Sequence, residues 1–368
     1  MGLRGAQGAL LISAFALVLT GCDLQTAGVS VKSELLAVKS TVDPSPSSTP
    51  MANPSPPPTP TASPSPTVGV IGPAITLFTT SGPVTVVSGQ TVTGLRISNP
   101  NGPCIYGNGV SNVHIYNNKI GPCGPSSDGT GVNFYNVHDV TVDHNSFDDV
   151  AGGIVVDKGT NNIVFHHNIA TRIRGPFPRG QLAQLGNVIG SGNRIYCNVS
   201  DQPTPGYGNG TEDHVNLWQS SGVAGSPILV QYNKLRGGGP STSGGGIIAG
   251  DGGGSYITVD TNILVNPGQY GITIAGGHDN QLLNNKVYSA SFPWSNVGGS
   301  VWNQYPAFAA YNEVVAGNRI YWLDRSGTPN HFWIQGNIPS ATYSNNVFGD
   351  SSITPSIWNE TFSQCNGQ

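Results

Sequence analysis

The sequence predicts an all-β fold, a parallel β-helix in which each coil of the chain stacks on the one before it. The first observation is a repeated pattern, with an apolar residue three positions before an asparagine and a small or apolar residue two positions after it. The second is that each unit alternates apolar and polar residues between Gly and Asn turns, without helical periodicity. The marker asparagines recur every 23 to 35 residues, at Asn118, Asn145, Asn168, Asn198, Asn233, Asn262, Asn285, Asn318 and Asn346.

The length of the repeat excludes a propeller, because a four-stranded blade needs about 40 residues. We expect the asparagines to be structural. Asn tolerates the left-handed conformation of a tight corner, and its amide can bond to the backbone of the turn and to the amide of the next coil.

Before the repeats, residues 1–22 predict a lipoprotein signal peptide. Arg4 precedes an apolar run over residues 9–19, too short to span a membrane. Leu19-Thr20-Gly21-Cys22 resembles the bacterial lipobox, which implies that Cys22 becomes the lipidated first residue. The alternative is an ordinary secretory signal. In both cases we expect export, and the lipobox implies a cell-envelope lipoprotein, either periplasmic or on the cell surface.

Residues 23–67 form a Pro/Ser/Thr-rich tract that we expect to be a disordered linker. Residues 68–368 then form one β-helix domain. The chain has 15 Lys and Arg against 19 Asp and Glu, and this balance argues against a nucleic-acid partner. We expect a monomer that contacts a membrane only through the lipid on Cys22.

The chain has 5 cysteines, and in an exported protein those other than Cys22 can form disulfides. Cys104 and Cys123 lie close in sequence, so we expect them to pair and close the first coil. Cys197 and Cys365 lie far apart along the stack, so we expect them to stay free unless the C-terminal tail folds back.

The uneven repeat lengths locate a candidate site. Three enlarged coils follow one another between Asn168 and Asn262, with insertions at residues 174–180, 201–214 and 237–246. We expect these loops to wall a groove whose floor is one sheet, because sites often lie on loops of a rigid scaffold. Its candidate residues are Asp157, Lys158, Arg172, Arg174, Arg179, Tyr207, Glu212, Asp213, His214, Asn216, Trp218 and Asp251.

The repeat pattern, the asparagine ladder and the walled groove together resemble the right-handed parallel β-helix proteins of the pectin-lyase-like superfamily, over about residues 75–350. The resemblance implies a right-handed helix of about nine to ten coils and a polysaccharide partner. The Gly-His-Gly of polygalacturonases and the Asp-Pro-His-Asp of mannuronan epimerases are absent. Fold alone does not set the activity.

The first functional hypothesis is a lyase or C5-epimerase acting on an acidic, uronate-containing polysaccharide. Proton removal beside a carboxylate needs a cation and a base. The candidates to bind the substrate carboxylate are Arg172, Arg174 and Arg179. The candidate base is His214 or Lys158, and the candidate acid is Tyr207. Calcium is a possible cofactor.

Two alternatives stay open. A glycosidase would use two of Asp157, Glu212, Asp213 and Asp251 as its acid and its base or nucleophile. A non-catalytic glycan-binding or structural surface protein would use the same groove only as a polar surface.

Further features lie outside the three enlarged coils. A strip of polar residues precedes the ladder by two positions, and it places Asp143 beside His166, with His144 and His167 stacked next to them. The aromatic stretch 291–312 could extend the groove, although we favour packing against the solenoid. We expect residues 351–368 to cover the last coil, and a segment between Val68 and Thr91 to cover the first.

Overall fold

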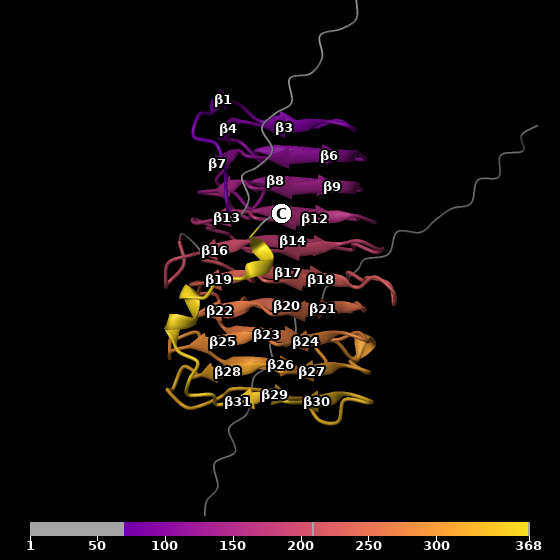
Figure 1. The fold of residues 1–368 in the computed structure, drawn as a ribbon, viewed down its shortest axis with the longest axis vertical. Coiled ribbons are helices and arrows are strands. Elements are labelled where there is room, and N and C mark those ends of the chain that lie inside the picture. The colour runs from indigo at the N-terminus through magenta and orange to yellow at the C-terminus, as the bar shows by residue number, and fades with distance from the viewer. Residues whose placement is uncertain (1–69, 208–209, 367–368) are drawn as a thin grey trace, which may run out of the picture. The chain divides into compact units, whose positions relative to one another are not determined.

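The computed structural model describes residues 70–207 and 210–366. In this part the chain winds through three parallel sheets, one strand of each per coil, and makes about ten coils. Figure 1 shows the coils stacked one on another from β1 to β31. The prediction of a parallel β-helix of nine to ten coils is confirmed.

The three sheets run along the stack, and each pairs strands of successive coils in parallel register. Sheet A has eleven strands, in the order β1 (Thr79–Ser81), β4 (Leu95–Asn99), β7 (Lys119–Cys123), β10 (Ser146–Phe147), β13 (Ile169–Ala170), β16 (Val199–Asp201), β19 (Lys234–Arg236), β22 (Ile263–Val265), β25 (Lys286–Ser289), β28 (Arg319–Trp322) and β31 (Val347–Phe348). Sheet B has ten, in the order β2 (Val84–Thr85), β5 (Ile105–Asn108), β8 (Val132–Tyr135), β11 (Ile154–Asp157), β14 (Ala183–Gly186), β17 (Val215–Trp218), β20 (Ile247–Asp251), β23 (Tyr270–Ile274), β26 (Val297–Val301) and β29 (Trp333–Ile334). Sheet C has ten, in the order β3 (Thr91–Thr93), β6 (Ser111–Tyr116), β9 (His138–Asp143), β12 (Ile163–His166), β15 (Arg194–Tyr196), β18 (Ile228–Gln231), β21 (Ile257–Asp260), β24 (Gln281–Leu283), β27 (Val314–Ala316) and β30 (Thr342–Ser344). Three short 3-10 helices complete the fold, η1 (Pro306–Phe308), η2 (Pro355–Asn359) and η3 (Ser363–Cys365).

Alternation along each strand decides which side chains fill the core. On β17, Val215 and Leu217 are fully buried inside the coil, whereas Asn216 and Trp218 belong to the outer face and line a cavity there. Successive coils repeat this pattern in register, since Val215 pairs with Ile247 and Asn216 with Ile248. The outer face of sheet B is therefore a continuous surface along the stack.

The asparagine ladder forms the corner between sheets C and A. At each step from Asn118 to Asn346, the backbone N–H and the side-chain Nδ2 of one asparagine both donate to Oδ1 of the next, as Asn198 does to Asn233 at 3.0 Å. Nδ2 also donates to backbone carbonyls, for example that of Phe165. The prediction that these asparagines are structural is confirmed.

The asparagine itself was predicted to take the left-handed backbone conformation at the corner, but the residue before it does so. The residue before the ladder asparagine has a positive φ, for example 51° at His144, 53° at His167 and 55° at Cys197. The turn is made at that position, and the asparagine that follows uses its amide to hold the coils together.

The C-terminal tail corrects two predictions. Cys197 and Cys365 form a disulfide, because residues 351–366 fold back along sheet A instead of covering the last coil. Ile353 and Ile357 pack on β22, and Figure 1 shows the tail rising beside the stack. Apolar side chains of the last coil stay exposed, such as Phe348 at 39%.

The other disulfide, Cys104–Cys123, is confirmed. At the start of the domain, residues 79–93 form the first coil itself through β1, β2 and β3, so the predicted separate cap is not found there. Before them, the backbone N–H of Gly72 donates to the carbonyl of His167 at 2.7 Å.

The predicted signal peptide (1–22), with Cys22, and the predicted linker (23–67) lie outside the described residues. No helix in the described part of the chain is long and apolar enough to cross a membrane.

Candidate functional site

A groove follows the outer face of sheet B. Two adjoining cavities of about 390 and 330 Å³ form it, and they share Ser243, Ile248, Tyr270 and Gln304. Each is within the usual size of a ligand site. The loops at 174–180 and 237–246 contribute Phe177, Pro178 and Ser243 to its walls, as the repeat lengths predict.

Asp213 and Asn216 line the larger cavity. Asp213 is the second residue before β17, and Asn216 projects from the outer face of that strand. The Asn216 amide nitrogen donates to Asp213 Oδ2 and to Asp251 Oδ2, both at 2.8 Å. One amide therefore bridges two carboxyl groups.

A β-bulge brings Asp251 to this bridge. Regular pairing of β17 with β20 would place Asp251 on the inner face, but the register shifts between Asn216 and Trp218, so Trp218 pairs with Asp251. The extra residue is Gly250, with φ of 68° and no room for a Cβ, which would lie 2.0 Å from the carbonyl oxygen of Gly276. Bulges often re-aim a side chain next to a functional site.

Tyr270, which was not predicted from the sequence, completes the cluster. Register places Asp213, Gly245 and Tyr270 at equivalent positions of three successive coils. A Cβ on Gly245 would lie 2.8 Å from the Tyr270 ring, so this glycine leaves space for the phenol to reach across one coil. The Tyr270 hydroxyl donates to Asp213 Oδ1, and the Gly245 N–H donates to the same oxygen at 3.1 Å.

Burial sets the protonation of the two carboxyl groups. Both aspartates are 8% exposed. Desolvation raises the pKa of Asp213 to about 7, against the three hydrogen bonds and with help from the charge of Asp251. Desolvation also raises the pKa of Asp251. Asp213 therefore keeps its proton to a higher pH than an exposed aspartate does.

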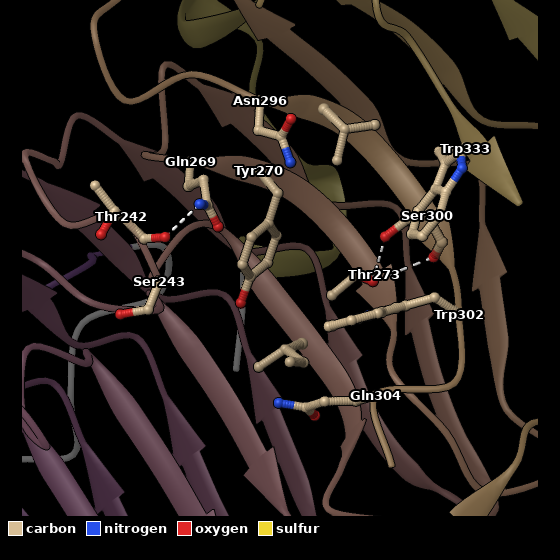
Figure 2. A pocket seen from close by; sticks show the side chains of 12 residues that line it. Thr242, Ser243, Gln269, Tyr270, Thr273, Asn296, Ser300, Trp302, Gln304 and Trp333 are labelled. Carbon is tan, nitrogen blue, oxygen red and sulfur yellow. Dashed lines mark hydrogen bonds between the residues drawn. The ribbon is translucent and has the colours of Figure 1, made fainter. Parts of the chain in front are cut away.

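Aromatic side chains line both halves of the groove. Trp218 and Tyr305 lie edge to face beside the carboxyl pair. Trp302 and Trp333 line the second half, where Figure 2 shows Tyr270 and Trp302 projecting into the same space above Gln304. The aromatic stretch 291–312 therefore contributes to the groove with Trp302 and Tyr305, whereas Trp294 packs against Gly239.

Within the described residues, no Lys or Arg lines either cavity. Arg172 pairs with Asp148 on the surface, with Nε 2.5 Å from Oδ1. Arg174 is held by Asp149 and by backbone carbonyls of the loop at 123–125. Arg179 donates to Gln184 Oε1 at 2.8 Å, next to the cavity, and burial lowers its pKa. The predicted arginine clamp is not assembled around the carboxyl pair.

Asp157, Lys158 and Tyr207 also lie away from the cavities. Lys158 is exposed and donates to the Tyr135 hydroxyl at 2.6 Å. Asp157 accepts a hydrogen bond from Asn187 at 3.1 Å. Tyr207 is exposed against Arg172. Of the predicted residues, the structure gathers Glu212, Asp213, Asn216, Trp218 and Asp251 in one cavity.

His214 is a correction, because its side chain points into the solenoid and is fully buried. Its Nδ1 lies 2.9 Å from Ser200 Oγ and its Nε2 donates to the Gly237 carbonyl at 2.8 Å. The residue next to Asp213 on a strand must face the opposite side. This geometry gives His214 no access to a ligand in the groove.

Gln184 and Gln304 also line the cavities but were not predicted from the sequence, and Trp302 was predicted only as part of the stretch 291–312. Gln184 pairs with Asn216 on the neighbouring strand, so an alignment of the repeats by strand register would have found it. Gln304 and Trp302 come from the loop after β26, whose path no repeat pattern predicts.

Residues 77–211 match the family described as "Right handed beta helix region". No curated protein sequence matches the chain.

Three solved structures are similar to the chain, each at 14% identity. The Dettilon tailspike protein has a TM-score of 0.37, over 75% of this chain and 60% of its own. The catalytic domain of a GH87 α-1,3-glucanase in complex with nigerose has a TM-score of 0.35, over 74% and 54%. The A-module of a mannuronan C-5 epimerase from Azotobacter vinelandii has a TM-score of 0.30, over 71% and 85%. The chain thus spans less than two thirds of the first two proteins.

The family match covers the first half of the domain, and the same coil continues through the second half in the structure. The fold of this chain is a right-handed parallel β-helix.

Proposed function

We propose that the protein is a glycoside hydrolase that cleaves a neutral polysaccharide bound along the groove of sheet B. The observation that carries this proposal is the pair of buried carboxyl groups, Asp213 and Asp251, bridged by Asn216 in a cavity with aromatic walls. The raised pKa of Asp213, about 7, supports its role as the general acid.

The spacing of the pair favours retention of configuration. Because both Oδ2 atoms lie 2.8 Å from one nitrogen, they are no more than about 5.6 Å apart, which suits the about 5–5.5 Å of retaining enzymes and is below the about 6.5–9.5 Å of inverting ones. Protonated Asp213 gives its proton to the leaving glycosidic oxygen while the Asp251 carboxylate attacks the anomeric carbon. Water then hydrolyses the glycosyl-enzyme, with Asp213 as the base.

Two further residues position the pair. Asn216 orients both carboxyl groups through its two N–H donors. The pKa of Tyr270 is raised well above its usual value by burial and by Asp213, so its hydroxyl keeps its proton and donates to Asp213. Asp251 Oδ1 is buried and has no hydrogen-bond partner among the described residues, which a bound ligand would have to supply.

The lining residues support a neutral substrate. A lyase or epimerase needs a cation to stabilise charge that develops beside the uronate carboxylate. In the described part of the chain the groove offers amides, hydroxyls and aromatic rings instead, such as Gln184, Thr273 and Trp302. We therefore rank the lyase or epimerase hypothesis below the hydrolase.

We also propose that the enzyme works outside the cytoplasm as a cell-envelope lipoprotein anchored through Cys22, with residues 23–67 as the linker. The support is the sequence of residues 1–22 and the two disulfides, which form in oxidising compartments. Labelling with a radioactive fatty acid would test it, with Cys22→Ser as the unlabelled control.

A glycan screen tests the activity. Full-length protein is incubated with neutral glucans, mannans, xylans and galactans, and with alginate and pectate. We expect new reducing ends from a neutral glycan, with no ultraviolet absorbance of an unsaturated uronate. Absorbance from alginate or pectate would instead establish a lyase. Binding to a glycan without any product would make the groove non-catalytic.

A further inference from the structure

A cluster of four histidines and one aspartate lies on the side of the stack where sheet C meets the ladder corner, away from the groove residues. Asp143 ends β9 and pairs in register with His166, which ends β12. His144 and His167 follow them at the corner, and His114 lies on β6. Four of the chain's 8 histidines therefore gather around one carboxylate.

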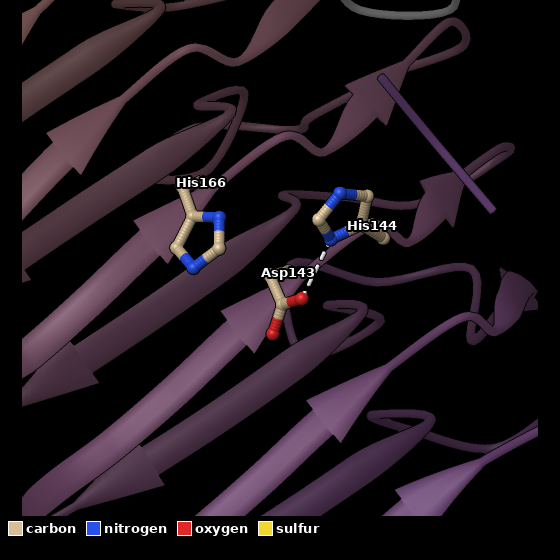
Figure 3. Close-up of side chains that lie close together, drawn as sticks. All are labelled: Asp143, His144 and His166. Carbon is tan, nitrogen blue, oxygen red and sulfur yellow. Dashed lines mark hydrogen bonds and ion pairs between the residues drawn. The ribbon is translucent and has the colours of Figure 1, made fainter. Parts of the chain in front are cut away.

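The carboxylate and the rings point at one another. Asp143 Oδ2 lies 2.6 Å from Nδ1 of His144, and Oδ1 lies 2.5 Å from Nε2 of His114. One ligand atom from each of Asp143, His144 and His166 lies within 4.8 Å of the others. Figure 3 shows a ring nitrogen of His166 facing the space between Asp143 and His144.

His167 adds a fourth nitrogen, because its tautomer is fixed. Its Nε2 lies 3.0 Å from the carbonyl oxygen of Cys365, which can only accept, so Nε2 carries the hydrogen. Neutral His167 therefore directs the lone pair of Nδ1 at Nδ1 of His166, 2.8 Å away. Without a metal, one proton must separate these two nitrogens. A cation in the adjoining space could instead bind both lone pairs.

The surroundings suit a bound metal ion. Asp143 is 3% exposed, and His144 and His167 are fully buried. His166 stacks on Tyr196 and His114 on Tyr116, so aromatic rings border the cluster along the stack. The Cys365 carbonyl orients His167 and His114 supports Asp143, the outer hydrogen bonds that metal ligands normally have.

We propose that Asp143, His144 and His166, with His167 as the fourth ligand, bind one divalent transition-metal ion such as Zn²⁺. Three imidazoles and one carboxylate suit zinc, copper or nickel, whereas calcium prefers a shell made only of oxygen atoms. Because His167 also contacts Cys365, the ion would tie the coils of β9 and β12 to the C-terminal tail. Metal binding would then stabilise the fold independently of the groove.

Calorimetric titration of Zn²⁺ into the full-length chain tests the proposal. The protein carries no polyhistidine tag, keeps its disulfides, and is treated with chelator and dialysed first. We expect one zinc ion per chain, a higher thermal midpoint with zinc, and no such effect of Ca²⁺. Asp143→Asn and His166→Gln should each weaken zinc binding by at least about 10-fold.

The matched control is His138→Ala. His138 lies on β9 as well and pairs with Asp139 at 2.7 Å, but no second imidazole lies near that pair within the described residues. This variant should bind zinc as the wild type does. The proposal is overturned if the wild-type chain binds no zinc, if both cluster variants keep wild-type affinity, or if His138→Ala loses zinc equally. The first of these outcomes does not depend on whether any variant folds.

Discussion

Two regions of the solenoid bury polar side chains in different ways. At the ladder corner, asparagines from Asn118 to Asn318 are almost fully buried, and each amide donates to the next coil and to backbone carbonyls. In the groove, Asp213, Asn216 and Asp251 are also buried, but Asn216 Oδ1 and Asp251 Oδ1 have no hydrogen-bond partner among the described residues. Buried polar groups that are hydrogen-bonded stabilise a fold. Buried polar groups without a hydrogen-bond partner are costly, and a bound ligand is one way to supply that partner.

The two regions also differ in that the ladder is repetitive and the groove cluster is irregular. The ladder repeats one residue in every coil, so its partners are supplied by the repeat itself. The groove cluster depends on features that occur once, namely the bulge at Gly250, the missing side chain of Gly245 and the loop after β26. Departures from the repeat therefore mark the candidate site of this solenoid.

The largest expected effect concerns the carboxyl pair. Asp213→Asn and Asp251→Asn should each lower kcat about 10²–10⁴-fold on the glycan that the screen identifies, because acid or nucleophile is lost. Asp157→Asn is the matched control, since Asp157 lies on the same sheet outside the cavities. Release of reducing ends measures all three. Equal losses in the control, or full activity in either variant, would refute the assignment.

The second-largest effect is expected on stability, from a substitution that breaks the asparagine ladder. Asn198→Ala removes the amide that joins Asn168, Asn233 and two backbone carbonyls. Leaving these buried groups unpaired should reduce the free energy of unfolding by about 3 kcal/mol or more. Asn101→Ala, at an exposed turn, should change it little. Denaturant unfolding provides the measurement, and similar values for the two variants would contradict a structural ladder.

Glu313 offers a buried carboxyl group away from the groove. It is fully buried, accepts from the backbone of Asn280 at 2.7 Å, and desolvation raises its pKa to about 8. The folded state therefore binds more protons than the unfolded chain between about pH 4.5 and 8, and this group lowers stability as pH rises through that window.

Glu313→Gln should consequently raise the thermal midpoint at pH 9 and leave it nearly unchanged at pH 4. Melting curves at the two pH values check this, with activity as the control because Glu313 does not line the cavities. A midpoint at pH 9 at or below that of the wild type would show that burial does not penalise its ionised form.

A smaller difference in stability is expected between variants that lack one or the other disulfide. Cys197–Cys365 spans 168 residues and Cys104–Cys123 spans 19, so in the chain-entropy account the long one stabilises by about 2 kcal/mol more. Cys197→Ala/Cys365→Ala should therefore lower the thermal midpoint further than Cys104→Ala/Cys123→Ala. The reverse order would show that the tail contributes little to the stability of the coils.

The smallest effect concerns the aromatic wall. Trp302→Ala should raise KM about 10-fold, equal to about 1.4 kcal/mol of binding, with a lesser change in kcat. Trp358→Ala, in η2 on the tail, is the control because it packs outside the groove. Equal kinetics for the two variants would place the substrate away from the second half of the groove.

The sequence by itself determined the repeating structure of each coil. The apolar spacing and the asparagine at each repeat specify which residue of every unit faces inward and where the corner falls, since strand alternation and turn chemistry are local. The lengths of the insertions also located the groove, and with it Asp213, Asn216 and Trp218.

Only the tertiary structure determined which side chains from different coils contact one another. It turned Asp251 outward through a bulge, placed Tyr270 against Asp213 over Gly245, and buried His214. It also returned the tail to Cys197 and His167. These contacts depend on register and on paths of loops and tail, which join residues far apart in sequence and therefore leave no periodic pattern.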